Sequence, residues 1–498
     1  MLYPTWRYQP SPTVQTPDWV KDAIFYQIFP DRFARSQRVP KPSYLEPWEA
    51  PPTFHGFKGG DLIGVAERLD YLHDLGITAV YFTPIFQSAA NHRYHTHDYM
   101  RVDPLLGGDE ALRFLVDEAH QRGIRIVIDG VFNHASRGFF QFNHLLENGA
   151  QSPYLDWFHV YGWPLYAYEH NRPPNYGAWF GLHALPKFNT RTPAVREYLW
   201  NVAEHWVRFG IDGWRLDVPN EIDDDAFWRE FRRRVKTANP EAYIVGEIWH
   251  DARRWLQGDQ FDAVMNYVFT RLCLGFFIGH QMDDGLVQGT GLHPAPVLDA
   301  REFALGIHQL LDLYVPDVTM VQLNLLDSHD TARFLTTARS DPTALHLATL
   351  FQMAYPGAPS IYYGDEVGKP GAKDPDSRRA MQWDDPSWWQ GEMYPFFKRV
   401  TALRHAHPAL RHGSYTTLHA SGPVYVFARY LAQDDQPADH LIVALNTDRT
   451  TRVARVEVKD WLADGTPVKD VWSGEVAVVE SGVLRLRLAP RSGVVLAV

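Results

Sequence analysis

The chain has 498 residues, of which 45% are hydrophobic and 21% are charged, a balance typical of globular proteins that leaves no room for wholesale disorder. Asp and Glu number 59 against 48 Lys and Arg, so the chain is acidic. Such a surplus repels phosphate backbones and anionic lipids, and we expect neither a nucleic-acid partner nor a membrane partner.

Cysteine usage and the first residues of the chain indicate the compartment. Cys273 is the only cysteine, so no internal disulfide can form, and the apolar run RLCLGFF around it predicts a buried packing role. The N-terminal region carries Pro4, Pro10, Pro12 and Pro17 where a signal peptide would need an apolar stretch. No run is long and apolar enough to span a bilayer. We therefore expect a cytoplasmic protein.

Strand-like runs alternate with helical patterns eight times between Val20 and about Pro408. This alternation is typical of βα units around a parallel sheet and predicts an α/β fold, a (β/α)8 TIM barrel. The predicted strands are residues 23–29, 77–85, 124–132, 212–218, 243–249, 263–268, 320–328 and 360–366. In such a barrel the strand ends converge on one face, so residues far apart in sequence can meet around one ligand.

Two segments interrupt or follow the predicted barrel. After the third strand comes an excursion of a length that is usually functional. It contains an aromatic cluster of Trp157, Trp163, Tyr166, Tyr176 and Trp179. From about Arg411, short alternating runs separated by turn residues predict an appended antiparallel β-sandwich. We expect a first part of the barrel at 1–132, an inserted domain at 133–190, a second part of the barrel at 191–410 and a C-terminal β-sandwich domain at 411–498.

Three acids stand in short polar motifs at the ends of predicted strands: Asp217 in GWRLDVPNE, Glu247 in VGEIW and Asp330 in LLDSHDT. For a single such acid, a helix cap or a solvated loop is the simpler interpretation. Three together at barrel strand ends favour catalysis, and paired carboxyl groups are typical of glycosidic-bond chemistry. Asp330, beside His329 in a polar turn, is expected to stabilise the transition state.

The surroundings of the first two acids predict different roles. Arg215 and Asp217 lie two residues apart on one strand, so both side chains leave the same face, and the guanidinium should keep Asp217 ionised as a nucleophile. Glu247 follows the apolar run YIVG and precedes Trp249, a setting expected to raise its pKa and keep it protonated as the general acid. If the two carboxyl groups lie roughly 5 to 5.5 Å apart, the reaction passes through a covalent glycosyl-enzyme with retention, whereas inversion needs a wider gap.

Four ordered motifs resemble those of the α-amylase family of glycoside hydrolases: DGVFNH (129–134), GWRLDVPNE (213–221), GEIW (246–249) and LLDSHDT (325–331). The resemblance covers nearly the whole chain, from FYQIFPDRF (25–33) to the C-terminal β-domain. It implies that Asp217 is the nucleophile, Glu247 the acid/base and Asp330 the stabiliser.

The resemblance also implies residues that hold the sugar. His134, Arg215 and His329 match positions that contact the sugar at the cleavage point, and His92 and Tyr94, in NHRYHTHDY (91–99), match positions that bind it or stack on it. Asp129 and Asn133 match structural positions of the same motif as His134.

Finer features resemble the neopullulanase, cyclomaltodextrinase and maltogenic amylase group. They are Asn220 and Glu221 after the nucleophile, Trp249 after the acid/base, and LPKFN (185–189), a variant of the group's MPKLN. The resemblance implies cleavage of α-1,4 links, with some α-1,6 cleavage, in cyclodextrins, maltooligosaccharides and pullulan. A 4-α-glucanotransferase or other transglucosylase remains an alternative because the covalent intermediate is shared. A non-catalytic sugar-binding relative is another, because a fold alone does not secure function.

Two departures from that group bear on assembly and on metals. The group usually carries an N-terminal β-domain that helps build a dimer, whereas this sequence lacks it and starts its barrel near Asp22, which predicts a monomer or a dimer of another kind. The group's calcium loop is rich in Asn and Asp, but FPDRFARSQRVPKP (29–42) offers Arg35, Arg38 and Lys41 instead. Hard cations need several oxygen ligands, and Asp61 alone does not supply them. We expect no calcium there, no other metal and no organic cofactor.

Overall fold

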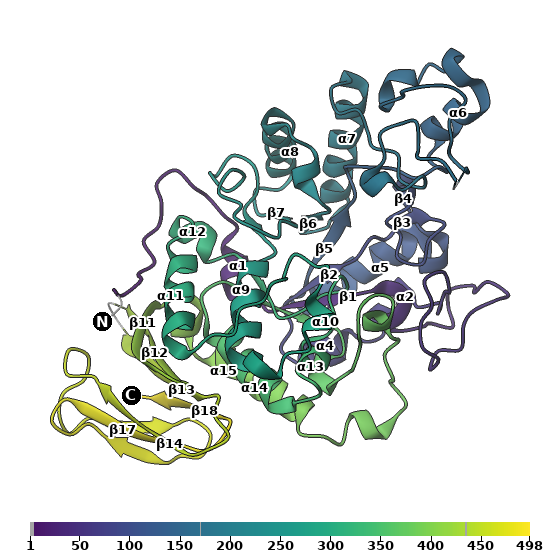
Figure 1. Cartoon of the computed structure of the whole chain (residues 1–498). Helices are drawn as coiled ribbons and strands as arrows, with labels where there is room; N and C mark the ends of the chain where they lie inside the picture. Colours follow the sequence, from purple (N-terminus) through teal and green to yellow (C-terminus); the bar gives the residue numbers. More distant parts are fainter. Residues whose placement is uncertain (1–3, 170, 434–435) are drawn as a thin grey trace.

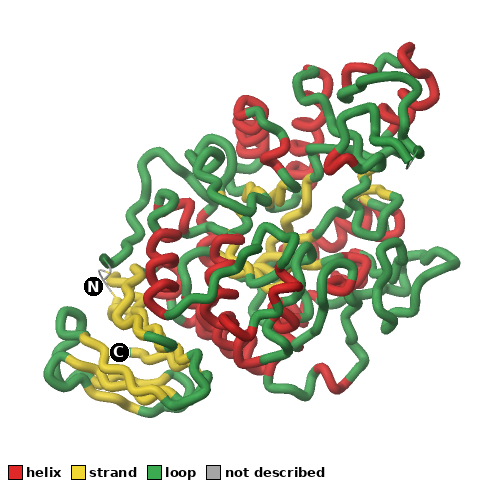
Figure 2. The backbone as a smooth tube through the Cα atoms, in the orientation of Figure 1, coloured by secondary structure: helices red, strands yellow, loops and turns green. Residues whose placement is uncertain are grey.

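The computed structural model describes residues 4–169, 171–433 and 436–498. A barrel stands at the centre, a small domain around helix α6 (Phe140–Asn148) projects at one end, and a β-domain packs at the other (Figure 1). Helices surround the short strands of the barrel, while the C-terminal domain consists of strands and loops (Figure 2).

The barrel is one sheet of eight parallel strands, which confirms the predicted fold class. The strands run in the order β8, β7, β6, β5, β2, β1, β10 and β9, and a parallel bridge from Met265 to Leu323 joins the two ends of the sheet. Each coincides with one predicted strand and is shorter than predicted. Their bounds are β1 (Phe25–Ile28), β2 (Ala79–Phe82), β5 (Arg125–Gly130), β6 (Gly213–Leu216), β7 (Tyr243–Gly246), β8 (Ala263–Val264), β9 (Leu323–Leu325) and β10 (Ala358–Tyr362).

Close packing between strands β5, β6 and β7 sets the geometry of the acids. A Cβ added to Gly213 would lie 2.4 Å from the carbonyl oxygen of Tyr243, so β6 can pair this closely with β7 only because the position is glycine. The register that results places Arg215 of β6 directly beside Asp129 of β5. Two charged side chains thereby face each other inside a barrel whose strands are mostly apolar and buried.

Helices connect most strands, whereas the described residues 247–262, between β7 and β8, form turns and loops. Every helix in the described chain is too short or too polar to cross a lipid bilayer. The helices outside the small domain are α1 (Asp18–Asp22), α2 (Pro30–Phe33), α3 (Leu62–Ala66), α4 (Leu69–Asp74), α5 (Gly108–Gln121), α7 (Pro193–Phe209), α8 (Asp225–Ala238), α9 (Tyr267–Cys273), α10 (Asp284–Val287), α11 (Ala300–Leu311), α12 (Pro316–Thr319), α13 (Phe334–Thr337), α14 (Pro342–Ala354), α15 (Met393–Ala406) and α16 (Pro408–His412).

Isolated bridges hold the excursion after β5 together, and one of them joins its two ends, His134 to Lys187. Its core is aromatic: Phe158 and Phe188 stack at 5.5 Å, and Trp157 and Tyr176 are buried. Of the aromatic cluster predicted from the sequence, those two residues therefore pack the small domain and are unavailable to a ligand. A two-stranded hairpin after β2, which is absent from the predicted strands, consists of β3 (Phe86–Ser88) and β4 (Thr96–Val102) and lies beside this domain.

The C-terminal domain consists of two antiparallel sheets, as predicted. Side chains of both sheets form one apolar core, among them Val426 and Ile442 from one sheet and Val456 and Leu484 from the other. The six-stranded sheet contains β11 (Ser414–Ser421), β12 (Val424–Gln433), β13 (Gln436–Asn446), β18 (Ser492–Ala497), β15 (Pro467–Asp470) and β16 (Val476–Val478), and the two-stranded sheet contains β14 (Arg452–Glu457) and β17 (Val483–Leu488).

Candidate active site

The three predicted catalytic acids lie at the carboxyl ends of barrel strands. Asp217 directly follows β6, Glu247 directly follows β7, and Asp330 stands in the turn after β9. Asp217 and Glu247 are 8% and 5% exposed, whereas the side chain of Asp330 is 30% exposed. The barrel thus places two buried carboxyl groups and one accessible carboxyl group on the same face.

Arg215 connects the buried acids. Its Nη1 donates to both oxygens of Asp129, at 3.0 and 2.8 Å, and to Oδ1 of Asp217 at 3.1 Å. Its Nη2 forms an ion pair with Oε2 of Glu247 at 2.9 Å. Asp217 and Glu247 therefore approach two nitrogens of one fully buried guanidinium.

One cation faces three carboxyl groups in this cluster, and their pKa values rise. Burial raises the pKa of Asp217 well above its ordinary range, and Arg215 only partly offsets that effect. Burial also raises the pKa of Glu247, while Arg215 lowers it, and burial raises the pKa of Asp129 to about 7. Arg215 thus lowers the pKa of Asp217 in the direction predicted from the sequence, but burial and the two neighbouring carboxyl groups outweigh this effect in the free protein.

These pKa shifts predict how the stability of the fold depends on pH. A carboxyl group whose pKa rises on folding contributes stability that is complete below its unfolded pKa and is lost as the pH rises through its folded pKa. For Asp129 that window runs from 3.8 to about 7. We expect Asp129→Asn to flatten the decline of the unfolding free energy between pH 4.5 and 7 by up to about 1.4 kcal/mol per pH unit. Urea unfolding at several pH values measures the slope, and identical slopes in the two proteins would contradict the prediction.

Two N–H groups orient Glu247. The backbone N–H of Val218 donates to Oε2 at 3.1 Å, and Nε1–H of Trp249 donates to Oε1 at 3.0 Å. Val218 has a φ of 36°, a left-handed conformation that costs a β-branched residue on the order of 1–3 kcal/mol and is typical of functional sites. The indole of Trp249 stacks on Tyr267 with ring centroids 3.6 Å apart. Trp249, predicted to bind substrate, thus also holds the acid.

A chain of hydrogen bonds links Tyr94 and His329 to Asp129. The side-chain amide of Gln27, on β1, donates to Nδ1 of His329 at 2.6 Å, which leaves the hydrogen on Nε2. Nε2 lies 2.6 Å from the hydroxyl of Tyr94, which donates to Asp129 at 2.9 Å. The rings of Tyr94 and His329 lie parallel, 5.6 Å apart. The structure therefore brings both predicted sugar-binding residues to the acid cluster.

Asp330 lies between a histidine and an arginine. Its Oδ2 is 3.1 Å from Nε2 of His329, and its Oδ1 is 3.3 Å from Arg378. Burial lowers the pKa of His329 well below its ordinary value, so the imidazole is neutral at neutral pH and Arg378 is the charged partner. Asp330 therefore contacts one neutral ring and one cation near the two buried acids.

His92, His134 and Asn133 border the same cluster. Nδ1 of His92 accepts the backbone N–H of Tyr94 at 3.1 Å, which leaves its Nε2–H as a donor. Asn133 lies 3.2 Å from Nδ1 of His134, whose ring stacks on Trp179 of the inserted segment at 5.4 Å. Burial lowers the pKa of His134 to about 3, so this ring is neutral. Trp179 is therefore the member of the predicted aromatic cluster that reaches the site.

Asn220 and Glu221 lie further out, in the 3₁₀ turn Pro219–Glu221 after β6. Glu221 is exposed and forms an ion pair at 2.8 Å with Lys187 of the LPKFN motif. Asn220 is half-buried in the same turn. The LPKFN motif and the turn after Asp217 are thus in contact, and this ion pair connects the inserted segment to that turn.

Sequence reasoning missed three residues of this site: Gln27, Tyr267 and Arg378. Gln27 did leave a signal, since it is the single polar residue in the buried strand FYQI. Tyr267 and Arg378 stand in segments without a recognisable motif, and only the fold brings them to Trp249 and Asp330.

Comparisons with known proteins agree with this geometry. Residues 27–413 match the model of the alpha amylase catalytic domain. The chain is 47% identical to a cyclomaltodextrinase of a Bacillus species over 90% of this chain and 76% of that protein. It is 43% identical to neopullulanase 2 of Thermoactinomyces vulgaris over 98% of this chain and 79% of that protein.

A solved structure is similar over the whole of its length. The debranching enzyme of Nostoc punctiforme is 50% identical to this chain and superposes with a TM-score of 0.89, covering 97% of this chain and 100% of that one. With the catalytic-domain model matching most of the sequence and the acids gathered at the strand ends of an eight-stranded barrel, the chain belongs to the alpha-amylase family of glycoside hydrolases.

Proposed function

We propose that this protein is a retaining α-glucan hydrolase in which Asp217 is the nucleophile, Glu247 the acid/base and Asp330 the stabilising acid. The observation that carries the proposal is the approach of Asp217 and Glu247 to one guanidinium at the ends of adjacent strands. A separation set by one side chain favours the narrow carboxyl spacing of a double displacement over the wider spacing that inversion requires.

Two proton transfers and two displacements make up the proposed reaction. Glu247 gives its proton to the glycosidic oxygen as Asp217 attacks the anomeric carbon, so the aglycone leaves with a new hydroxyl group and an ester forms. A water molecule then gives a proton to Glu247 and attacks the same carbon, which releases Asp217 as a carboxylate. Arg215 remains fixed and stabilises the charge that moves between the two acids.

We propose α-1,4-linked cyclodextrins, maltooligosaccharides and pullulan as the substrate class. The names of the cyclomaltodextrinase and neopullulanase relatives support this class, and the similar debranching enzyme favours some α-1,6 cleavage. Chromatography of the products from β-cyclodextrin, pullulan, starch and sucrose, offered side by side, tests it. We expect short maltooligosaccharides from β-cyclodextrin, and the absence of any reducing sugar from all glucans would contradict the proposal.

A glucanotransferase on the same scaffold would share the ester and differ only in the acceptor. Product analysis at high maltose concentration separates the two, since a transferase forms longer oligosaccharides at the expense of glucose release. A non-catalytic sugar-binding relative would not need three acids held by Arg215, Trp249 and Arg378.

We propose that no calcium ion binds after β1. Both oxygens of Asp61 are occupied: Oδ1 accepts the N–H of Gly64 at 2.7 Å, and Oδ2 accepts the N–H of Ser36 at 2.8 Å and also pairs with the Lys41 ammonium. A cation at this carboxylate would have to displace Lys41 and meet its repulsion.

Removing divalent cations is therefore expected to change nothing. We predict that dialysis against EDTA leaves the melting temperature and the turnover of maltotriose unchanged. Loss of activity that calcium alone restores would contradict this prediction.

We further propose that the protein works in the cytoplasm. Cys273 is buried and free, and burial raises its pKa well above the ordinary value, so it suits a reducing compartment and takes no part in catalysis.

A further inference from the structure

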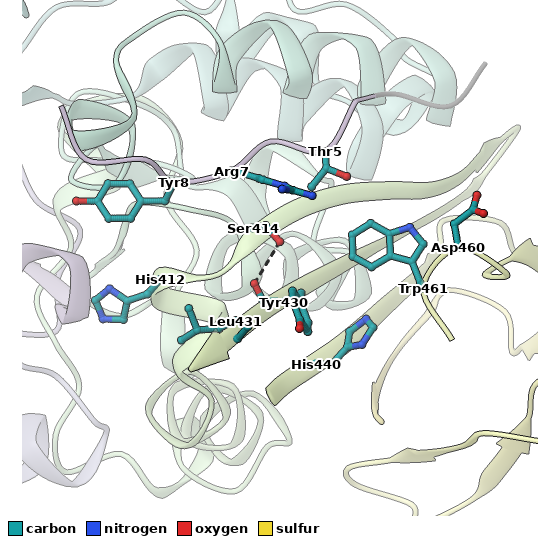
Figure 3. A pocket seen from close by; sticks show the side chains of 11 residues that line it. Thr5, Arg7, Tyr8, His412, Ser414, Tyr430, Leu431, His440, Asp460 and Trp461 are labelled. Atoms are coloured by element: carbon teal, nitrogen blue, oxygen red, sulfur yellow. Dashed lines mark hydrogen bonds between the residues drawn. The ribbon is translucent and has the colours of Figure 1, made fainter. Parts of the chain in front are cut away.

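A second cavity lies between the N-terminal segment and the C-terminal β-domain. Its volume is about 530 Å³, within the range of small-molecule sites. Arg7 of the N-terminal segment, Tyr430 of β12, His440 of β13, and Asp460 and Trp461 of a turn line it (Figure 3).

This cavity faces away from the catalytic acids. Tyr8, on its wall, donates a hydrogen bond to Asp317, which precedes β9, and His412, also on its wall, bonds to Asp22, which precedes β1. The cavity thus adjoins the amino ends of the barrel strands, whereas Asp217 and Glu247 follow their carboxyl ends. A ligand bound here would touch none of the catalytic groups.

Three aromatic rings form one wall. His440 lies 5.3 Å from Tyr430 and 6.0 Å from Trp461, and the planes are inclined by 73° and 52°. Tyr430 and Trp461 are only half-buried, so part of each ring remains accessible from the cavity. Amphipathic rings of this kind offer a flat apolar surface to the C–H face of a sugar.

Polar groups surround these rings. His440 is 9% exposed, and its buried Nε2 has no hydrogen-bond partner in the part of the chain that the structure describes. Arg7 is exposed, extends over the cavity towards Trp461 (Figure 3), and forms no ion pair with any described residue. Asp460, also exposed, contributes a carboxylate to the same cavity.

We propose that this cavity is a second carbohydrate site, which binds a segment of two or three glucose units of an α-glucan. Hydroxyl groups accept from the guanidinium and donate to the carboxylate or to the imidazole, and the rings cover the apolar face of the sugar. An anionic ligand fits less well, because the carboxylate of Asp460 lines the same cavity and the chain carries a net charge of −11. The choice of α-glucan as the ligand rests on the proposed function.

Calorimetric titration of the full chain with maltoheptaose tests the site in a Glu247→Gln background, where the ligand is not consumed. We expect two molecules per chain in this parent and one after Trp461→Ala. Trp472→Ala is the matched control: this tryptophan is 39% exposed in the same domain but lies outside the cavity, and two molecules should still bind. Arg7→Ala, at an exposed position that leaves the core intact, should weaken the second binding event at least threefold.

In the active protein, Trp461→Ala is expected to leave the turnover of maltotriose within twofold of the original. The proposal is overturned if the parent and the Trp461→Ala protein each bind one maltoheptaose molecule. It is also overturned if a folded Trp461→Ala protein still binds two. A third outcome separates the two proposals. If the parent binds one molecule, Trp461→Ala abolishes this binding, and the active protein hydrolyses no glucan, then the second site is supported and the proposed function fails.

Discussion

Asp217→Asn is expected to lower kcat on maltotriose by about 10⁴-fold or more while the protein stays folded. The amide has nearly the shape of the carboxyl group and can remain beside Arg215, but it cannot form the glycosyl ester on which both displacements depend. Initial-rate measurement of reducing ends, with a melting curve for the same sample, gives the result.

Asp251→Asn is the control for this change. Asp251 lies four residues after Glu247, pairs with Arg253 at the surface and is removed from the cluster, so the same loss of charge there should leave kcat within twofold. Turnover of the Asp217→Asn protein within tenfold of the original would remove Asp217 from the role of nucleophile.

Arg215→Met is expected to lower the free energy of unfolding by about 3–5 kcal/mol at pH 8 and to abolish activity, because it leaves buried carboxyl groups without their cation. Asp129 and Asp217 lose their hydrogen bonds to Nη1, and Glu247 loses its ion pair. The loss should be smaller at pH 5, where these carboxyl groups hold protons more readily.

Urea unfolding at both pH values measures this effect. The matched control is Arg253→Met, whose side chain is 65% exposed and pairs with Asp251, and it should leave the free energy of unfolding unchanged within error. An Arg215→Met protein as stable at pH 8 as the Arg253→Met protein would contradict the assigned role of Arg215.

The barrel could be predicted because its strands are nearly continuous apolar runs separated by helical patterns, which is a local property of the sequence. The acids could be placed because each follows its strand directly or within a few residues. The hairpin of β3 and β4 could not be predicted, because its sequence lacks the alternation of apolar and polar residues that identifies a half-buried strand.

The raised pKa of Asp217 could not be predicted from its neighbours in sequence. Arg215 was recognisable two residues away, but the burial of the cluster and the approach of Asp129 and Glu247 arise from three different strands. Gln27 is a similar case: a polar residue in a buried strand signals a function, yet its partner His329 lies about 300 residues away. The roles of the aromatic residues in the inserted segment could not be predicted either, since Trp179 stacks on His134 at the site whereas Trp157 is buried in the core of the segment.

Covalent labelling tests the central claim most directly. A fluorinated maltosyl fluoride that slows the second displacement should trap the glycosyl-enzyme, and mass spectrometry of peptides should find one maltosyl ester, on Asp217, that is absent from the Asp217→Asn protein. An ester on another carboxylate, or turnover of the reagent by a protein that never carries one, would contradict the account.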